Sequence, residues 1–210
     1  MDKITKEGLT AILDSIAALM EEQKQFLVEL DGSMGDGDLG LTMCNGFNAV
    51  KEEIRTQAET DMGKLLMKLG MKMNSTVPST MGTLISTCFL KAATKAKGKT
   101  ELTLADQVAM GEGAVSGVME RGKTKRGEKT MLDVLAPAID ALKEASAQGK
   151  NLSEAWLNAF AAAEKGLEET KKMEAVHGRA AYYREKSIGR PDPGAAAMMY
   201  VIKGIALAVK

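Results

Sequence analysis

The feature that most constrains the fold of this chain is a helical spacing of apolar residues, which recurs along most of its 210 residues. Near the N-terminus, for example, Leu9, Ile12, Leu13 and Ile16 recur at intervals of three and four residues and would line one face of a helix. No alternation of apolar and polar residues is long enough to predict a strand. The sequence therefore predicts an all-α protein.

The same spacing predicts about eight helices, which would begin near residues 9, 40, 61, 79, 103, 130, 153 and 193. Thr103 with Asp106 approximates a capping box, and Asp192 followed by Pro193 is typical of a helix start. Because short connections favour antiparallel neighbours, we expect a barrel or bundle of about eight antiparallel helices in one domain, residues 1–210. A longer loop is expected at about residues 174–190, and such loops are usually functional.

Composition and charge argue against several classes of protein. The 28 basic and 28 acidic side chains cancel, so no overall field would attract nucleic acid or an anionic membrane. Cys44 and Cys88 do not have a Cys-x-x-Cys spacing, which predicts two reduced, packed thiols. The N-terminal residues lack an apolar signal region, and Lys203 interrupts the most apolar segment, residues 194–209. We expect a cytoplasmic protein.

A glycine-rich acidic loop interrupts the helical pattern at residues 30–43, LDGSMGDGDLGLTM. Asp31, Asp36 and Asp38 lie so close in sequence that their mutual repulsion is unfavourable unless a cation neutralises it. Oxygen-only ligands indicate Mg²⁺ or a similar hard ion. The glycines permit positive φ, and a helix start at residues 39–42 offers backbone N–H groups to a phosphate.

The loop also has interpretations other than a metal site. A solvated acidic loop with helix caps is common, because Asp and Gly are turn residues. A phosphatase with an aspartyl nucleophile needs an apolar strand before Asp36, yet Gly-Ser-Met-Gly precedes it. A calcium EF-hand is excluded, because the twelfth position counted from Asp31 or Asp36 is Thr42 or Phe47 rather than Glu.

Several further segments have both a structural and a functional interpretation. Residues 121–130 are the densest basic stretch, which by itself is more often a solvated loop than an anion site. Residues 75–83 form a hydroxyl-rich helix start, for which capping is the simpler role and phosphate binding the functional one. Arg179 offers a two-pronged donor, and Asp192–Gly194 forms a turn. His177 is expected to have no special role.

Taken together, these motifs resemble the nucleotide-binding L subunit of dihydroxyacetone kinase. The resemblance lies in the order D-x₄-D-x-D-x-G, a Ser/Thr-rich helix start ending in Gly82, R-G-K…G-x-K-T-M, and G-R-A…S-I-G…D-P-G. It runs the whole length of the chain. It implies a barrel of eight antiparallel helices that holds ADP or ATP at one end, with two Mg²⁺ ions bridging three aspartates to the phosphates.

The resemblance also implies roles for individual residues. Asp31, Asp36 and Asp38 would be the Mg²⁺ ligands, and together with Arg179 they would be the catalytic residues. The expected nucleotide-binding residues are Leu39, Gly40, Leu41, Thr42, Thr80, Met81, Gly82, Gly122, Met131, Arg179, Asp192, Pro193 and Gly194. Gly122 and Met131 would line the adenine pocket. Members that keep ADP permanently bound often have His at the Leu39 position, so nucleotide should exchange more readily here.

The function implied by the resemblance is that of a kinase subunit. It would transfer a phosphoryl group from a Mg²⁺-bound adenine nucleotide to a small ketose held on a partner K subunit. The donor would be either free ATP or ADP recharged by a phosphocarrier protein. The alternatives are a nucleotide-loaded regulatory module without turnover and, with less support, an aspartyl phosphatase.

Overall fold

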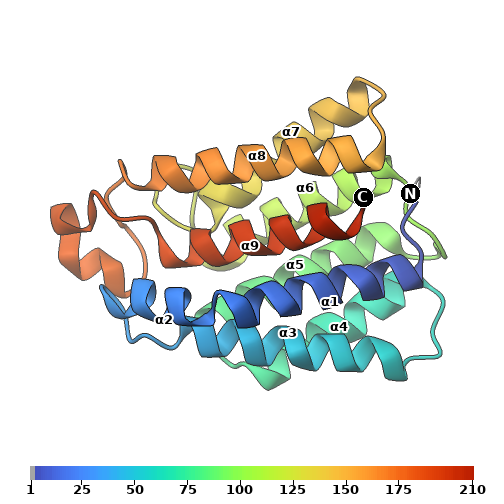
Figure 1. Ribbon diagram of the computed structural model, residues 1–210, viewed down its shortest axis with the longest axis horizontal. Helices are drawn as coiled ribbons and strands as arrows, with labels where there is room; N and C mark the ends of the chain where they lie inside the picture. The colour runs from blue at the N-terminus through green and yellow to red at the C-terminus, as the bar shows by residue number, and fades with distance from the viewer. Residues whose placement is uncertain (1–2) are drawn as a thin grey trace.

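The computed structural model describes residues 3–210, which form nine α-helices, one 3₁₀ helix and no strand (Figure 1). In chain order they are α1 (Lys6–Glu22), α2 (Lys24–Gly32), α3 (Leu39–Thr56), α4 (Met62–Thr76), α5 (Thr80–Ala96), α6 (Leu104–Gly122), α7 (Leu132–Ala147), α8 (Leu152–Thr170), the 3₁₀ helix η1 (Arg179–Ser187) and α9 (Pro193–Ala208). The prediction of an all-α protein is confirmed.

Eight of these helices close into a ring. α1 packs against α3, each later α-helix packs against the next, and α9 returns to pack against α1. α2 adds to the ring by packing against α3 and α9. In Figure 1, α2 and η1 lie at one end of the molecule and both chain termini lie at the other. The expected barrel of about eight helices is therefore confirmed, and it has two distinct ends.

Apolar side chains from around the ring form one continuous core. Met20, Phe47, Leu69 and Leu142, which come from four different helices, are each almost fully buried. Burial of such side chains is the main favourable contribution to folding. The ring closes tightly where α9 meets α1, because a Cβ at Gly204 would lie only 2.9 Å from the Cα of Ile16.

Several helix starts follow the sequence prediction. Thr103 and Asp106 form the expected capping box at α6. Asp192 accepts a hydrogen bond from the backbone N–H of Ala195, with Pro193 as the first residue of α9. Ser79 caps α5 by accepting from the N–H of Gly82, so residues 75–83 do include a helix cap. Each cap satisfies an N–H group that the helix itself leaves without an acceptor.

The structure differs from the predicted elements in three places. The first predicted helix is divided at Gln23, which lies between α1 and α2 with φ −95° and ψ 5°. The sequence carries no signal for this break, since glutamine is a good helix former. The predicted loop at residues 30–43 is shorter than expected, because Asp31 and Gly32 belong to the last turn of α2. The predicted loop at residues 174–190 contains η1.

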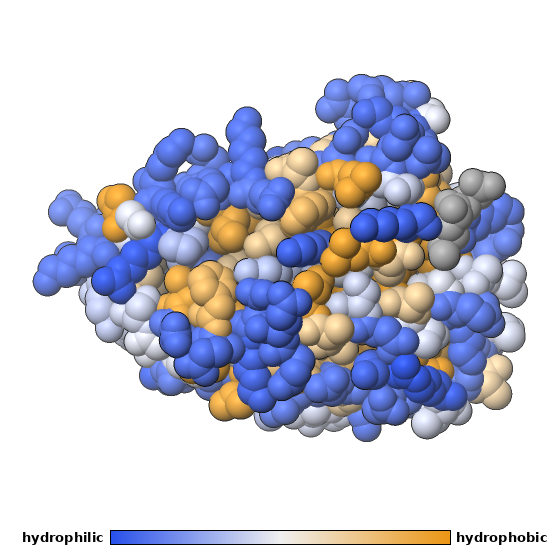
Figure 2. Space-filling model, in the orientation of Figure 1, coloured by the Kyte–Doolittle hydropathy of each residue, from blue (hydrophilic) through white to orange (hydrophobic). Residues whose placement is uncertain are grey.

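The face of the molecule seen in Figure 2 is mainly hydrophilic, with hydrophobic residues scattered between the charged ones. None of the described helices combines the length and the apolar character needed to cross a bilayer.

Cys44 and Cys88 are both free thiols in the structure, as the sequence predicted.

Candidate functional site

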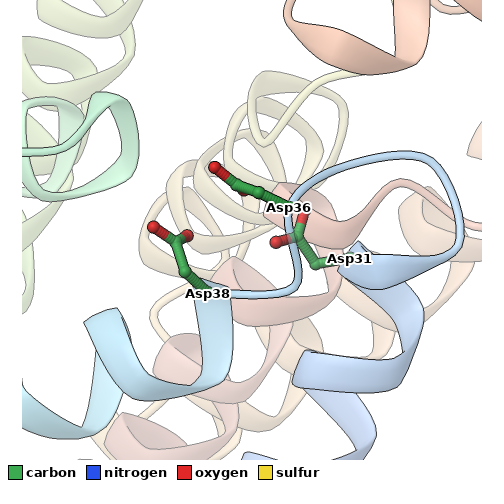
Figure 3. Close-up of side chains that lie close together, drawn as sticks. All are labelled: Asp31, Asp36 and Asp38. Atoms are coloured by element: carbon green, nitrogen blue, oxygen red, sulfur yellow. The ribbon is translucent and has the colours of Figure 1, made fainter.

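The three aspartates of the acidic loop come together at the end of the barrel that carries α2 and η1. Asp31 lies in the last turn of α2, Asp36 lies in the loop, and Asp38 immediately precedes α3. One carboxylate oxygen from each residue lies within 4.8 Å of the others. Figure 3 shows the three aspartate side chains close together at this loop.

Glycines allow the loop, residues 33–38, to fold back on the end of α2. The carbonyl of Asp31 accepts a hydrogen bond from the N–H of Gly35 at 2.6 Å. A Cβ at Gly35 would lie 2.4 Å from the Oδ1 of Asp31, so a side chain there would displace this carboxylate. Gly37 has a φ of 73°, which disfavours other residues. The three aspartates are therefore brought together by interactions between residues that are close in sequence.

The start of α3 is joined to the same cluster. The backbone N–H of Leu39 donates to Oδ2 of Asp31 at 3.3 Å. The next N–H groups, of Gly40 and Leu41, belong to the first turn, in which a helix supplies no acceptor of its own. The side chain of Leu41 is exposed, whereas Leu39 and Gly40 are buried. Within the turn at residues 39–42, the N–H groups of Gly40 and Leu41 and the positive end of the helix dipole can therefore face an anion.

The charges of the cluster favour a cation. The pKa of Asp38 is raised, first by partial burial and then by the neighbouring charges of Asp36 and Asp31, while Arg179 opposes the rise. Arg179, from η1, forms an ion pair with Asp36, with 2.7 Å between Nη2 and Oδ2. Three convergent carboxylates supply the oxygen-only donors that hard divalent cations prefer. The residues present therefore fit Mg²⁺.

A second group of expected residues lies together where α5, α7 and α9 begin. A Cβ at Gly194 would lie 3.8 Å from the sulfur of Met81 and 3.9 Å from Cβ of Met131. Asp192 precedes them in the α9 turn, and its backbone N–H donates to Oγ1 of Thr170. Burial raises the pKa of Asp192 to about 7. Met81 and Met131 are both buried, so they form a packed apolar group with Gly194 at these helix starts.

The remaining expected residues are distributed around these two groups. Thr80 is exposed at the first turn of α5, next to buried Met81 and Gly82, and Pro193 is buried at the start of α9. Gly122 ends α6, and its nearest neighbours are the side chains of Thr124 and Leu84. Among its closest contacts, Gly122 therefore meets none of the other expected residues.

Sequence reasoning missed two tyrosines beside the acidic loop, Tyr182 and Tyr183. An open hollow of about 590 Å³ beside the acidic loop is lined by Met34, Gly35, Arg179, Tyr182 and Tyr183. The two tyrosines stand in a segment without helical spacing, so no pattern singled them out. Their proximity to Arg179 in sequence was the available signal.

The basic stretch at residues 121–130 was predicted to be a solvated loop, and that prediction is wrong for two buried side chains, those of Thr124 and Lys129. Lys125 and Arg126 are exposed, as expected, but the side chain of Lys129 is only 2% exposed. Lys129 could not be distinguished from its neighbours by composition, because its acceptors come from distant parts of the chain. His177 also has a partner, since its Nε2 is hydrogen-bonded to Glu128 at 2.7 Å.

Comparisons with known proteins bear on the fold and on the site. The DAK2 domain family matches residues 33–207 of this chain. The Escherichia coli K12 protein named PEP-dependent dihydroxyacetone kinase, ADP-binding subunit DhaL, is 36% identical over 91% of this chain and 91% of its own length. The Listeria innocua protein named PEP-dependent dihydroxyacetone kinase 1, ADP-binding subunit DhaL, is 33% identical over 87% of this chain and 86% of its own length.

A solved structure gives the same fold. The crystal structure of the dihydroxyacetone kinase of C. freundii, in its complex with AMP-PNP and Mg²⁺, superimposes with a TM-score of 0.70 at 24% identity, over 99% of this chain. This chain spans 34% of the length of that kinase chain.

Proposed function

Because this chain belongs to the DAK2 domain family, we propose that it is the ADP- and ATP-binding subunit of a dihydroxyacetone-type kinase. In this function it transfers a phosphoryl group from a Mg²⁺-bound adenine nucleotide to a small ketose held on a partner K subunit. The observation that carries the proposal is the convergence of Asp31, Asp36 and Asp38 beside Arg179 and the start of α3. Whole-length similarity to a protein named as an ADP-binding kinase subunit supports it.

The proposed nucleotide lies across the two groups of residues described above. Its phosphates face the acidic loop, the first turn of α3 at residues 39–42, Thr80 and Arg179. Its adenine ring lies toward Met81, Met131 and Gly194, with Gly82, Gly122, Asp192 and Pro193 completing the surround. The C. freundii kinase was crystallised with AMP-PNP and Mg²⁺, which are the ligand classes that this arrangement suits.

Phosphoryl transfer needs positioning and charge neutralisation more than a protein nucleophile. Bound Mg²⁺, proposed as two ions, would neutralise negative charge on the phosphates. The three carboxylates would hold the metal. Arg179 can leave its exposed pair with Asp36 at little cost and donate to a phosphate oxygen instead. The chain itself contributes no covalent intermediate.

The proposed function also involves a partner protein and a cellular compartment. We propose that residues 1–210 work as one domain and that the K subunit supplies the ketose. The donor is either free ATP or ADP recharged by a phosphocarrier protein, and the compartment is the cytoplasm. The kinase names of the relatives do not favour a regulatory module or a phosphatase. A regulatory module would bind nucleotide but give no turnover with a K-type subunit.

The metal cluster is tested by thermal unfolding with and without Mg-ADP. At a ligand concentration a hundredfold above the dissociation constant, the wild type should gain about 2.7 kcal/mol. Asp36→Asn should lose most of this gain while its ligand-free form stays folded, because the change removes a metal ligand but relieves repulsion. Asp14→Asn is the matched control, since Asp14 is similarly exposed and also pairs with an arginine.

Equal ligand-dependent gains in the wild type and Asp36→Asn would contradict the proposed metal site. Phosphorylation of dihydroxyacetone, measured after a K-type subunit is added, then tests the kinase itself. Nucleotide binding without any such turnover would favour the regulatory alternative.

A further inference from the structure

Lys129 is buried in a way that the proposed function does not explain. Among residues 3–210 it is the one lysine whose side chain is buried, with 2% exposed. Its Nζ donates to four backbone carbonyls, those of Thr170 at 2.7 Å, Met173 at 3.1 Å, Ser187 at 2.8 Å and Arg190 at 2.7 Å. An ammonium group has only three N–H bonds, so the four oxygens must share them. All four oxygens also lie close to its positive charge.

Burying an ammonium is costly unless hydrogen bonds and opposite charge offset the loss of water. Here the compensation comes from carbonyl dipoles, much as carbonyl oxygens replace the hydration shell of an ion in a channel. Burial lowers the pKa of Lys129, and the charge of Asp192 opposes that change. Because the buried ammonium depends on these four carbonyls, it fixes the position of the backbone that carries them.

The backbone that carries Lys129 is itself fixed to α7. Lys129 has a φ of 57°, an unusual conformation for a lysine. On either side of it, the N–H groups of Gly127 and Thr130 donate to the two carboxylate oxygens of Asp133. Asp133 lies in the first turn of α7 and is buried. The ammonium group therefore projects from a rigid support.

The four carbonyls lie at both ends of one segment. Residues 171–191 are here called the Arg179 segment. Thr170 and Met173 lie at its start, and Ser187 and Arg190 lie near its end. The ends also bond to each other, since the N–H of Gly189 donates to the carbonyl of Lys171 at 2.7 Å. Between them lies Arg179, whose side chain reaches Asp36. Asp192 and the α9 turn follow directly.

We propose that Lys129 is a positioning residue: by gathering these carbonyls it closes the Arg179 segment and holds Arg179 and the Asp192–Gly194 turn against the nucleotide. The inference rests on the proposed function for its ligand, but not for its structural part. Lys129 itself touches neither metal nor nucleotide. It acts through the two ends of the segment.

The test uses Lys129→Ala in the full chain, with Lys172→Ala as the matched control. Lys172 lies in the same segment, but its side chain is 73% exposed and pairs with Glu169 at the surface. Two quantities are measured: amide hydrogen exchange with no ligand, and the dissociation constant of Mg-ADP by calorimetry. n-Propylammonium chloride, which replaces the deleted atoms, is compared with sodium chloride at equal concentration.

In Lys129→Ala, exchange within residues 171–191 should rise at least tenfold while the core amides of α3 and α4 keep their wild-type rates. The dissociation constant of Mg-ADP should rise at least tenfold. Propylammonium should reverse part of both effects, and sodium should reverse neither. Lys172→Ala should match the wild type. A purely structural lysine would instead raise exchange throughout the protein and leave affinity unchanged once the variant is folded.

Wild-type exchange in the segment of a folded Lys129→Ala overturns the inference, whatever happens to nucleotide. If the wild type binds no Mg-ADP, the proposed function fails, while the exchange result still decides whether Lys129 holds the Arg179 segment closed. If Lys129→Ala does not fold, Lys129→Arg becomes the variant that tests the inference. Arginine keeps the charge, but its planar guanidinium cannot donate to four oxygens that surround one point. Raised exchange confined to the segment then supports the inference, and wild-type exchange overturns it.

Discussion

The acidic loop and the Arg179 segment face each other at one end of the barrel, yet they are held in place by different means. The acidic loop, residues 33–38, spans the short distance between α2 and α3, and its glycines and the Asp31 carbonyl determine its path. The Arg179 segment, residues 171–191, is held by Lys129, which lies more than 40 residues away in the sequence. One half of the site is built locally, and the other depends on a distant contact.

This difference predicts how each half should fail. A change where the acidic loop meets the start of α3 should affect the stability of the whole fold, because the backbones of α2 and α3 approach each other closely there. A change in the Arg179 segment should affect affinity or local opening, because most of its side chains are exposed.

Gly40→Ala should destabilise the protein most. A Cβ at Gly40 would lie 2.2 Å from the backbone carbonyl oxygen of Lys24 and 2.8 Å from Cγ2 of Val28, so α3 would have to move away from α2. We expect a loss of about 3 kcal/mol, the upper part of the usual range for overpacking. Chemical denaturation measures it. Gly113→Ala, in α6, is the control, because its Cβ would have an ordinary contact at 3.4 Å.

Gly113→Ala should gain roughly 0.5–1 kcal/mol, since alanine is the better helix former. If Gly40→Ala proves as stable as the wild type, the close approach of α2 and α3 does not shape the acidic loop, and the local half of the comparison is wrong.

Arg179→Lys should weaken Mg-ADP binding without changing the stability of the ligand-free protein. Its pair with Asp36 is exposed, so its loss should alter the free energy of unfolding by less than about 0.5 kcal/mol. Binding should weaken by about 1.5–3 kcal/mol, because an ammonium cannot reproduce the two-pronged guanidinium. Calorimetry and thermal unfolding measure the two quantities.

Arg126→Lys is the control for Arg179→Lys, because Arg126 forms an exposed two-pronged pair with Asp140. It should leave nucleotide affinity unchanged. Equal affinity for Arg179→Lys and the wild type would show that Arg179 does not contact the nucleotide.

Tyr182→Ser should have the smallest effect on stability. Its side chain is 89% exposed, so the free energy of unfolding should stay within about 0.5 kcal/mol of the wild-type value. Tyr200→Ser is the matched control, because Tyr200 packs edge to face against Phe26 and should lose more than about 1 kcal/mol. A comparable loss in Tyr182→Ser would mean that the Arg179 segment is held by its own side chains rather than at its ends.

Sequence reasoning succeeded where the determining interactions are close along the chain. The capping box of Thr103 and Asp106 and the start of α9 at Asp192 and Pro193 depend on residues within one helical turn. The break at Gln23 had no local signal, so the predicted first helix was too long. Lys129 was assigned to a solvated loop for the same reason, since its four acceptors lie 41 to 61 positions away.

The sequence by itself determined that the chain is helical, that its helices are about eight in the ring, and that three aspartates lie together in a glycine loop. These properties follow from apolar periodicity, capping and turn chemistry, which act over a few residues. Only the tertiary structure decided that Arg179 meets Asp36, that Met81 and Met131 meet Gly194, and that Lys129 is buried among carbonyls. Such contacts depend on how the ring closes, because packing joins residues whose separation in sequence carries no pattern.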